Sequence, residues 1–416
     1  MKDLLIYNPK KIFLPCRYED IPSYGQNTVH CLQDQSIVIS RGKVREFRKT
    51  SSLQGHLQDF KVLDSSGKSI TPGFVDTHTH MVYGGNRSEE FELRARGTTY
   101  LQLLESGNGI NRTVRDTRSS SLNELLQGSM ERLATHISNG VTTVEIKTGY
   151  GLRLDAEERM LRAMEIMEKF SGIKIMKTLL PLHAIPTDRD RKEYLQEAEK
   201  EILFKLGKRV DFVDSFCDQG AFSPEETEHF FQAASKFRIP ARLHADEIKN
   251  IGALRLTEKF KIRSVDHLLH SSVGEIKLAN SHGAIPTILP GTAFSLGEKY
   301  ADAGLWIKEG IPVGVASDVS PLSPVTDMKF HGNLAVRFCG MSPNEVFNGM
   351  TTVGASSLGL DGRKGSLEVG MDADMLISDI DDVRDLYYNW SNVKFTVLSK
   401  GRILNMKKIM TKSITS

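Results

Sequence analysis

The sequence predicts an α/β protein, namely a (β/α)8 TIM barrel with a small β-sandwich domain formed by both chain ends. Three observations lead to this fold class. The middle of the chain alternates eight short apolar runs with amphipathic stretches, and regular alternation of this kind implies a parallel sheet. Both ends are rich in strand-length segments instead. The 416 residues accommodate a barrel of ~250 residues together with a smaller domain.

The two chain ends read as parts of one sheet domain. Residues 1–69 contain short apolar or alternating runs, and residues 38–44 suit a hairpin. Residues 374–377 and 395–404 look similar at the far end. We therefore expect a β-sandwich from 1–69 and 363–416 around a barrel at 70–362. Two unrelated β-arms are the alternative. The strands expected near the N-terminus are 4–7, 36–39, 43–47 and 61–64.

The barrel strands are expected where short apolar runs end in polar residues. The helices between them show apolar spacing of three and four, as at Leu122, Leu126 and Leu133. Ser223-Pro224 and Ser342-Pro343 each look like an N-cap followed by proline at the first helical position. An open doubly wound sheet is the alternative, but no Gly-x-Gly-x-x-Gly turn follows the first strand. The eight expected strands are 74–76, 142–146, 173–176, 210–213, 241–244, 264–267, 284–289 and 313–316.

Composition excludes several classes of partner. The net charge is +2, which gives no bulk attraction to nucleic acid or to a membrane surface. The four cysteines are widely spaced and form no Cys-x-x-Cys motif. No apolar run approaches the ~18 residues of a membrane span. We expect a cytoplasmic protein that acts on a small-molecule substrate, without nucleic-acid or membrane partners. A homodimer is compatible with the sequence, although no stretch identifies an interface.

Metal-capable side chains collect at the carboxyl ends of the expected strands, where barrel proteins carry their sites. His78 and His80 follow the first strand at a spacing that directs both imidazoles to one face. His244 ends the fifth strand and Asp318 follows the eighth. Two hydrogen-bonding loop histidines are the alternative for His78 and His80. Three imidazoles and one carboxylate neutralise an ion only partly, which suits activation of water.

Two further groups are candidates for catalysis beside this set. Glu247 lies three residues after His244, where it can shuttle protons between water and a leaving nitrogen. His267 ends the sixth strand and can polarise a substrate carbonyl, or work with Asp318 in activating water. A helix cap is the alternative for Glu247, and a structural barrel histidine is the alternative for His267.

The order and spacing of these blocks resemble the amidohydrolase superfamily and, within it, the imidazolonepropionase family. The resemblance rests on Asp76-Thr77-His78-Thr79-His80, Lys147-Thr148-Gly149-Tyr150-Gly151-Leu152, His244-Ala245-Asp246-Glu247 and Val265-Asp266-His267-Leu268, together with Thr117-Arg118. It implies metal-dependent hydrolysis of the cyclic amide C–N bond of 4-imidazolone-5-propanoate to N-formimidoyl-L-glutamate, in histidine degradation. It also implies one Zn2+ or Fe3+ ion per subunit on His78, His80, His244 and Asp318.

The same resemblance implies the substrate contacts. Arg87 offers a planar fork for a propionate carboxylate, although a surface ion pair with Glu89 or Glu90 is its alternative. Tyr150 and His183 can donate to a small polar ring or stack on it, and Glu247 is expected close to that ring. The loop after Asp318 departs from the family pattern. Its expected substrate-side residues are Ser320, Leu322 and Ser323, where Ser320 replaces an amide donor and Leu322 replaces a glycine.

Two other functions remain open from the sequence. A related amidohydrolase that deaminates a cyclic amidine or an aromatic ring is one, since such enzymes also use His-x-x-Glu. A catalytically silent barrel that binds a metal, a ligand or a protein partner is the other.

Overall fold

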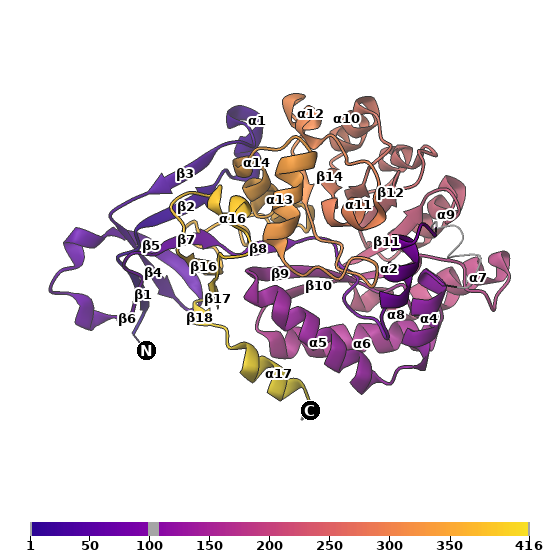
Figure 1. The fold of residues 1–416 in the computed structure, drawn as a ribbon, viewed down its shortest axis with the longest axis horizontal. Helices are drawn as coiled ribbons and strands as arrows, with labels where there is room; N and C mark the ends of the chain where they lie inside the picture. The colour runs from indigo at the N-terminus through magenta and orange to yellow at the C-terminus, as the bar shows by residue number, and fades with distance from the viewer. Residues whose placement is uncertain (1, 99–107, 415–416) are drawn as a thin grey trace.

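The centre of the molecule is a barrel of eight parallel strands with helices around it (Figure 1). The computed structural model describes residues 2–98 and 108–414. The strands pair in the order β15-β14-β13-β12-β11-β10-β9-β8, so each pairs with its neighbour in sequence. A bridge between Thr79 and Val319 brings the segments that follow the first and last strands together. This confirms the predicted (β/α)8 TIM barrel.

All eight barrel strands lie where the sequence predicts them, but β10 extends six residues and β11 four residues beyond the predicted ends. Their bounds are β8 (Phe74–Asp76), β9 (Val141–Lys147), β10 (Lys174–Leu182), β11 (Phe212–Cys217), β12 (Ala241–Ala245), β13 (Ile262–His267), β14 (Ile285–Ile288) and β15 (Gly314–Val315). The first strand ends at Asp76, so His78 and His80 lie just beyond it.

The helices are mostly amphipathic and several begin at side-chain caps. Ser223 and Ser342 are N-caps, as predicted, and each forms a capping box with a glutamate three residues later. In the described part of the chain, no helix combines the length and apolar character that a membrane span needs. The helices are α1 (Ile21–Tyr24), α2 (Ser88–Ala95), α4 (Ile110–Ser119), α5 (Leu122–Ser138), α6 (Leu154–Ser171), α7 (Arg191–Glu197), α8 (Phe204–Leu206), α9 (Pro224–Ser235), α10 (Val273–Ser281), α11 (Pro290–Leu296), α12 (Ala303–Lys308), α13 (Met328–Phe338), α14 (Pro343–Gly349), α15 (Thr352–Ser357), α16 (Asp385–Tyr388) and α17 (Met406–Ile414).

The two chain ends build a pair of sheets beside the barrel (Figure 1). One sheet has the order β5-β4-β1-β6, and the other has the order β18-β17-β16-β7-β2-β3. Their facing side chains share one core, which includes Ile37 and Ile39 from the first sheet and Ile70 and Met375 from the second. The strands are β1 (Leu4–Tyr7), β2 (Lys11–Pro15), β3 (Val29–Leu32), β4 (Gln35–Ser40), β5 (Lys43–Lys49), β6 (Lys61–Asp64), β7 (Ser69–Pro72), β16 (Met375–Ser378), β17 (Thr396–Ser399) and β18 (Arg402–Ile403).

The second of these sheets contains strands from both ends of the chain. N-terminal β7 pairs with C-terminal β16, and this favours one shared sandwich over two separate arms. We propose the division 1–69, 70–362 and 363–416 as the domain limits, with the first boundary moved to residue 72 so that β7 stays in its sheet. Helix α17 lies outside the sandwich and contacts α5 and α6 of the barrel.

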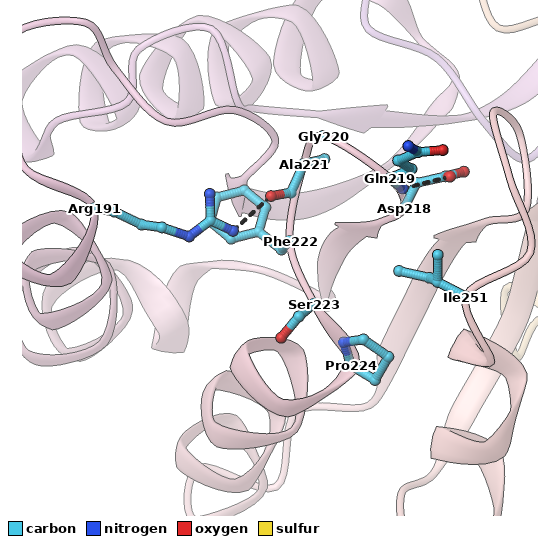
Figure 2. Close-up of a pocket in the computed structure, with 9 residues that line it drawn as sticks. All are labelled: Arg191, Asp218, Gln219, Gly220, Ala221, Phe222, Ser223, Pro224 and Ile251. Carbon is cyan, nitrogen blue, oxygen red and sulfur yellow. Dashed lines mark hydrogen bonds between the residues drawn. The ribbon is translucent and has the colours of Figure 1, made fainter.

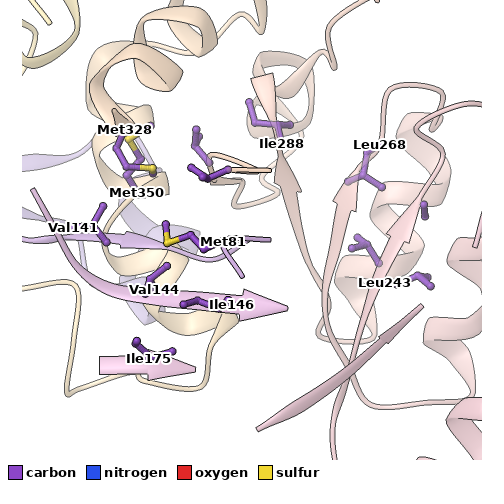
Figure 3. Close-up of a cluster of buried hydrophobic side chains, with 14 of the residues drawn as sticks. Met81, Val141, Val144, Ile146, Ile175, Leu243, Leu268, Ile288, Met328 and Met350 are labelled. Atoms are coloured by element: carbon purple, nitrogen blue, oxygen red, sulfur yellow. The ribbon is translucent and has the colours of Figure 1, made fainter. Parts of the chain in front are cut away.

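The main apolar core lies between the barrel strands and their covering helices. Figure 3 shows Val141, Val144 and Ile146 of β9 in this core, together with Met328 and Met350. Burying such side chains supplies about 1.5–3 kcal/mol each. The core therefore provides a stable frame that fixes the carboxyl ends of the strands, where the polar side chains gather.

Candidate active site

Three buried histidines converge at the carboxyl end of the barrel. His80 Nε2 lies 3.2 Å from His78 Nε2 and 3.3 Å from His244 Nε2. These three residues form a group whose ligand atoms all lie within 4.8 Å of one another. Burial lowers the pKa of His78 and of His80 well below the usual value, and nearby Lys147 and His183 add to the effect. Neutral imidazoles have a free lone pair, which is the form that binds a metal.

The spacing of the three nitrogens fits a shared metal ion. Two donors about 2.0–2.1 Å from a zinc ion and at a tetrahedral angle lie about 3.3 Å apart. The Nε2 atom of His80 lies 3.2 Å from that of His78 and 3.3 Å from that of His244, and both separations match this edge length. Three neutral nitrogens cannot all satisfy one another by hydrogen bonds, because each neutral ring has one N–H. The donor set is therefore suited to an ion.

Asp318 approaches the same point from the segment after β15, which lies beside the segment after β8. Its Oδ1 atom lies 3.6 Å from His80 Nε2 and 3.8 Å from His78 Nε2. Its backbone N–H donates to His78 O, and Thr292 Oγ1 donates to its carboxylate. Burial raises the pKa of Asp318 to about 6. The structure thus brings together all four residues that the sequence proposes as metal ligands.

Two buried aspartates lie behind the histidines and orient them. Asp266 Oδ2 is 2.7 Å from His78 Nδ1, and Asp214 Oδ2 is 3.0 Å from His244 Nδ1. When a carboxylate accepts a proton from Nδ1, the lone pair of the ring remains on Nε2. Only the His78 contact has aligned hydrogen-bond geometry: among the described residues, Nδ1 of His80 and Nδ1 of His244 are both buried without such a bond, so Asp214 faces the His244 ring at ion-pair distance.

A buried lysine links these aspartates. Lys147 Nζ lies 2.8 Å from both Glu145 Oε1 and Asp214 Oδ2, and 3.9 Å from Asp266 Oδ2. Burial opposes its charge, but Asp214 and Glu145 outweigh that effect and raise the pKa of Lys147. Arg242 adds a second buried cation, with Nη2 2.9 Å from Thr77 O and 3.4 Å from Asp266 Oδ2. Two cations therefore hold three carboxylates inside the barrel.

Sequence reasoning missed this network, although a signal was present. Lys147 and Arg242 interrupt apolar strands, and a single charge in a strand usually points to solvent. In a closed parallel barrel both faces of each strand are covered, so the charge must find a buried partner. Charged residues within predicted barrel strands were the available clue.

Glu247 and His267 lie next to each other near the histidine group. Glu247 Oε2 is 3.6 Å from His267 Nε2, and the His267 and His244 rings are 5.3 Å apart. Burial raises the pKa of Glu247 well above its usual value, with Asp318 and Asp218 adding to the shift. Burial lowers the pKa of His267 well below the usual value. A protonated carboxyl beside a neutral imidazole forms a pair that can pass a proton in either direction.

Asp218 holds the turn that carries Glu247. Its Oδ2 accepts the backbone N–H of Glu247 at 2.7 Å and of Ile248 at 3.0 Å, while Oδ1 accepts that of Lys249 at 2.9 Å. Figure 2 shows Asp218 bonded also to Gln219, at the edge of a pocket of about 380 Å³. None of the four proposed metal ligands lines that pocket, so we assign it no part in the chemistry.

Tyr150 and His183 lie beside the histidine group. The His183 ring stacks on the His80 ring at 4.8 Å, and the Tyr150 ring is 5.1 Å from His183. Nδ1 of His183 is 3.0 Å from Gly149 O, so it acts as the donor and leaves Nε2 as an acceptor. Burial lowers the pKa of His183 to about 3. The Tyr150 ring is buried and the His183 ring is half-buried, and both are adjacent to the proposed metal ligands.

Arg87 forms the ion pair that the sequence offered as an alternative, but the pair is buried. Arg87 Nε donates to Glu90 Oε2 at 2.7 Å, and Glu90 Oε1 accepts the backbone N–H of Gly109 at 2.8 Å. The Glu90 carboxylate therefore holds the Arg87 guanidinium by the edge that carries Nε. Within the described residues, no hydrogen bond or ion pair joins Arg87 to the histidine group.

The serines of the loop after Asp318 hydrogen-bond to each other and to α11. Ser323 N donates to Ser320 Oγ, and Ser323 Oγ donates to Gly291 O, both at 3.3 Å. Ser320 and Ser323 are buried, while Leu322 is half-buried. The Oγ atoms of the two serines expected to meet a substrate are therefore hydrogen-bonded to protein groups in this structure.

A barrel with histidines and an aspartate gathered at its carboxyl end is typical of metal-dependent hydrolases, and sequence comparison agrees. The sequence profile described as "Amidohydrolase family" matches residues 69–404. The imidazolonepropionase of Thermoplasma volcanium is 39% identical over 88% of this chain and 89% of its own length. That of Clostridium tetani is 34% identical over 97% of this chain and 99% of its own length. The chain therefore belongs to the imidazolonepropionases of the amidohydrolase family.

A solved structure agrees with the fold. The atrazine chlorohydrolase of Arthrobacter aurescens TC1 complexed with zinc superposes with a TM-score of 0.71, covering 99% of each chain at 16% identity. At this identity the likeness supports the architecture alone.

Proposed function

We propose that this protein hydrolyses the cyclic amide C–N bond of 4-imidazolone-5-propanoate and produces N-formimidoyl-L-glutamate, as a step of histidine degradation. The observation that carries the proposal is the convergence of His78, His80 and His244 with Asp318 in reach, in a chain with full-length imidazolonepropionase relatives. Water adds its oxygen to the ring carbonyl carbon, the bond from that carbon to the ring nitrogen breaks, and the nitrogen takes up a proton.

His78, His80, His244 and Asp318 would hold one Zn2+ or Fe3+ ion per subunit. A bound ion of this kind polarises a carbonyl oxygen and lowers the pKa of water. Three nitrogens and one oxygen suit both metals. Asp266 and Asp214 would keep two of the three imidazoles in the tautomer that presents Nε2.

Glu247 would carry the proton that moves during the reaction. Its raised pKa favours the protonated form of the carboxyl, and this form can give a proton to the leaving nitrogen. His267, 3.6 Å away, can accept a proton or donate a hydrogen bond to the substrate carbonyl. Asp318 would assist in activating the water.

The acidic side chain and the ring of the substrate would be bound by separate groups. Arg87 would pair with the propionate carboxylate through the edge of its guanidinium that Glu90 leaves free. Tyr150 and His183 would contact the ring, with Glu247 close to it. Ser320, Leu322 and Ser323 would close the other side. Ser323 must release Gly291 O before its hydroxyl can donate to a ligand, whereas Ser320 Oγ accepts from Ser323 N and its own O–H can donate without breaking that bond.

The test is a pair of assays on 4-imidazolone-5-propanoate, with and without a chelator. We expect loss of substrate absorbance, formation of N-formimidoyl-L-glutamate without ammonia, and inhibition that added Zn2+ or Fe3+ reverses. Ammonia release would favour a deaminase. Metal binding without turnover of this substrate would reject the proposal and favour a silent barrel. A cytoplasmic location and a homodimer stay predictions of the sequence.

A further inference from the structure

The turn that carries Tyr150 is held by a buried carboxylate that none of the catalytic roles uses. Glu157 lies in the first turns of α6 and is fully buried. Its Oε1 atom accepts the backbone N–H groups of Gly151 and Leu152, each at 2.8 Å. Both of its oxygens lie 3.2 Å from Gly149 N. One carboxylate therefore satisfies three backbone donors of a single turn.

Arg118 of α4 binds the carbonyl groups of the same turn. Arg118 Nε donates to Gly151 O at 2.7 Å, and Nη2 donates to Leu152 O at 3.0 Å. Its remaining nitrogen pairs with the half-exposed Asp188 at 3.1 Å. The turn thus gives its N–H groups to an anion on one helix and receives bonds from a cation on another.

The two glycines of the turn are explained by this arrangement. A Cβ atom at Gly151 would lie 2.5 Å from the backbone nitrogen of Glu157 and 2.8 Å from its Oε1. Gly149 has φ of +103°, and a Cβ atom there would lie 2.9 Å from His183 Nδ1. The Gly149-Tyr150-Gly151 motif is therefore required by close approach to Glu157 on one side and His183 on the other.

The turn connects Glu157 and Arg118 to two proposed substrate contacts. Tyr150 lies between the bonded residues of the turn, and His183 donates its Nδ1–H to Gly149 O. We propose that Glu157 and Arg118 are positioning residues that fix Tyr150 and His183 for the substrate ring and so determine substrate affinity. This inference rests on the proposed function for its substrate. Whether Glu157 and Arg118 hold the turn, an arrangement that we call the clamp, can be measured independently.

The experiment compares wild type with Glu157→Met, Glu157→Gln and Arg118→Met. Glu158→Gln and Glu165→Gln are matched controls, because both remove an acidic charge of the same helix that pairs with Arg209 and does not touch the turn. The measurements are amide hydrogen exchange at residues 149–152, KM and kcat for 4-imidazolone-5-propanoate, and metal content. Glu157→Gln keeps one acceptor oxygen, so it covers the case in which Glu157→Met does not fold.

We expect about tenfold faster exchange at 149–152 and about a tenfold higher KM in Glu157→Met and Arg118→Met, because unpaired buried N–H groups weaken the closed turn. Glu157→Gln should show a smaller change of the same kind. The fall in kcat should be smaller than the rise in KM, and metal content and both controls should match wild type. A merely structural role would instead lower metal content and kcat together.

Unchanged exchange at 149–152 would overturn the clamp, and faster exchange with unchanged KM would overturn its role in affinity. Asp218→Asn provides a crossed comparison, since it should affect exchange at 247–249 and leave 149–152 protected. A wild-type protein that does not hydrolyse the substrate would reject the proposed function by itself. The exchange comparison would still decide whether Glu157 and Arg118 hold the turn.

Discussion

Replacing Lys147 by methionine tests the view that one buried ammonium organises the metal ligands. The substitution removes the cation that lies 2.8 Å from both Glu145 and Asp214 and 3.9 Å from Asp266. Removing one partner of a buried ion pair costs about 3–5 kcal/mol. Arg242 still pairs with Asp266, at 3.4 Å, whereas Asp214 keeps the His244 ring and the Ser215 N–H but no lysine or arginine ion pair among the described residues. We therefore expect the free energy of unfolding to fall by an amount near the upper end of that range, about 4–5 kcal/mol.

That loss is a large fraction of the 5–15 kcal/mol that ordinarily stabilises a domain. The assay is urea unfolding of the metal-free protein, followed by titration with Zn2+ against a chelator. Zn2+ affinity should fall about 10–100-fold, as for other residues that orient metal ligands.

Lys329→Met is the matched control. Lys329 is also buried, but it pairs with Asp327 and Asn139 away from the histidines. This variant should lose stability and keep its Zn2+ affinity. If Lys147→Met binds Zn2+ as tightly as wild type, or unfolds at the same urea concentration, the proposed role of the network is wrong. Lys147→Arg keeps the charge and serves if the methionine variant does not fold.

Four further predictions concern single residues. Asp318→Asn should bind Zn2+ at least tenfold more weakly and lose most turnover, which metal analysis and kinetics measure; wild-type values would remove it as a ligand. Glu247→Gln should retain metal and lose about 100-fold or more in kcat, and a normal rate would exclude proton transfer by this group. Arg87→Ala should raise KM about tenfold or more with a smaller change in kcat, and an unchanged KM for the acidic substrate would refute carboxylate binding. Asp246→Asn should stabilise the protein by about 1–2 kcal/mol at pH 7, and the gain should disappear as the pH falls below 5.

The sign for Asp246 follows from its surroundings. Burial raises its pKa to about 6, so above that pH the folded state holds a charge that the unfolded chain holds more easily. The full shift corresponds to about 3 kcal/mol, which partial solvation reduces. Asparagine removes the charge, accepts the bond from Ser271 Oγ and tolerates the φ of 55° at this position. Equal urea midpoints for variant and wild type at pH 7 would contradict this account.

Much of the fold could be predicted because its signals are local. The eight barrel strands are short apolar runs between helices with clear caps, and all eight were located, although β10 ends at Leu182, six residues beyond its predicted end. The sandwich strands β2, β3 and β7 were missed. Strand β7 is Ser-Ile-Thr-Pro and β3 is Val-His-Cys-Leu, and neither shows a clean alternation or an apolar run. Their strand state depends on pairing with distant segments, which local propensity does not contain.

The candidate metal ligands were predictable because barrel topology gathers the ends of all strands at one face. The groups behind them were not. Asp214, Asp266 and Lys147 look like ordinary polar residues in strands, and Glu157 and Asp218 look like solvent-facing acids. Their roles appear only when the chain closes and backbone N–H groups or imidazoles become their neighbours.

By itself, the sequence determined the barrel, the family and the four proposed metal ligands, since periodicity and motif spacing are carried by neighbouring residues. The tertiary structure alone decided how close the three imidazoles come, which carboxylates orient them, and that Arg87 is paired with Glu90 inside the protein. The reason is physical. Burial removes water from a charged group, and the partner that must replace that water is chosen by the fold, often more than 60 residues away in the chain.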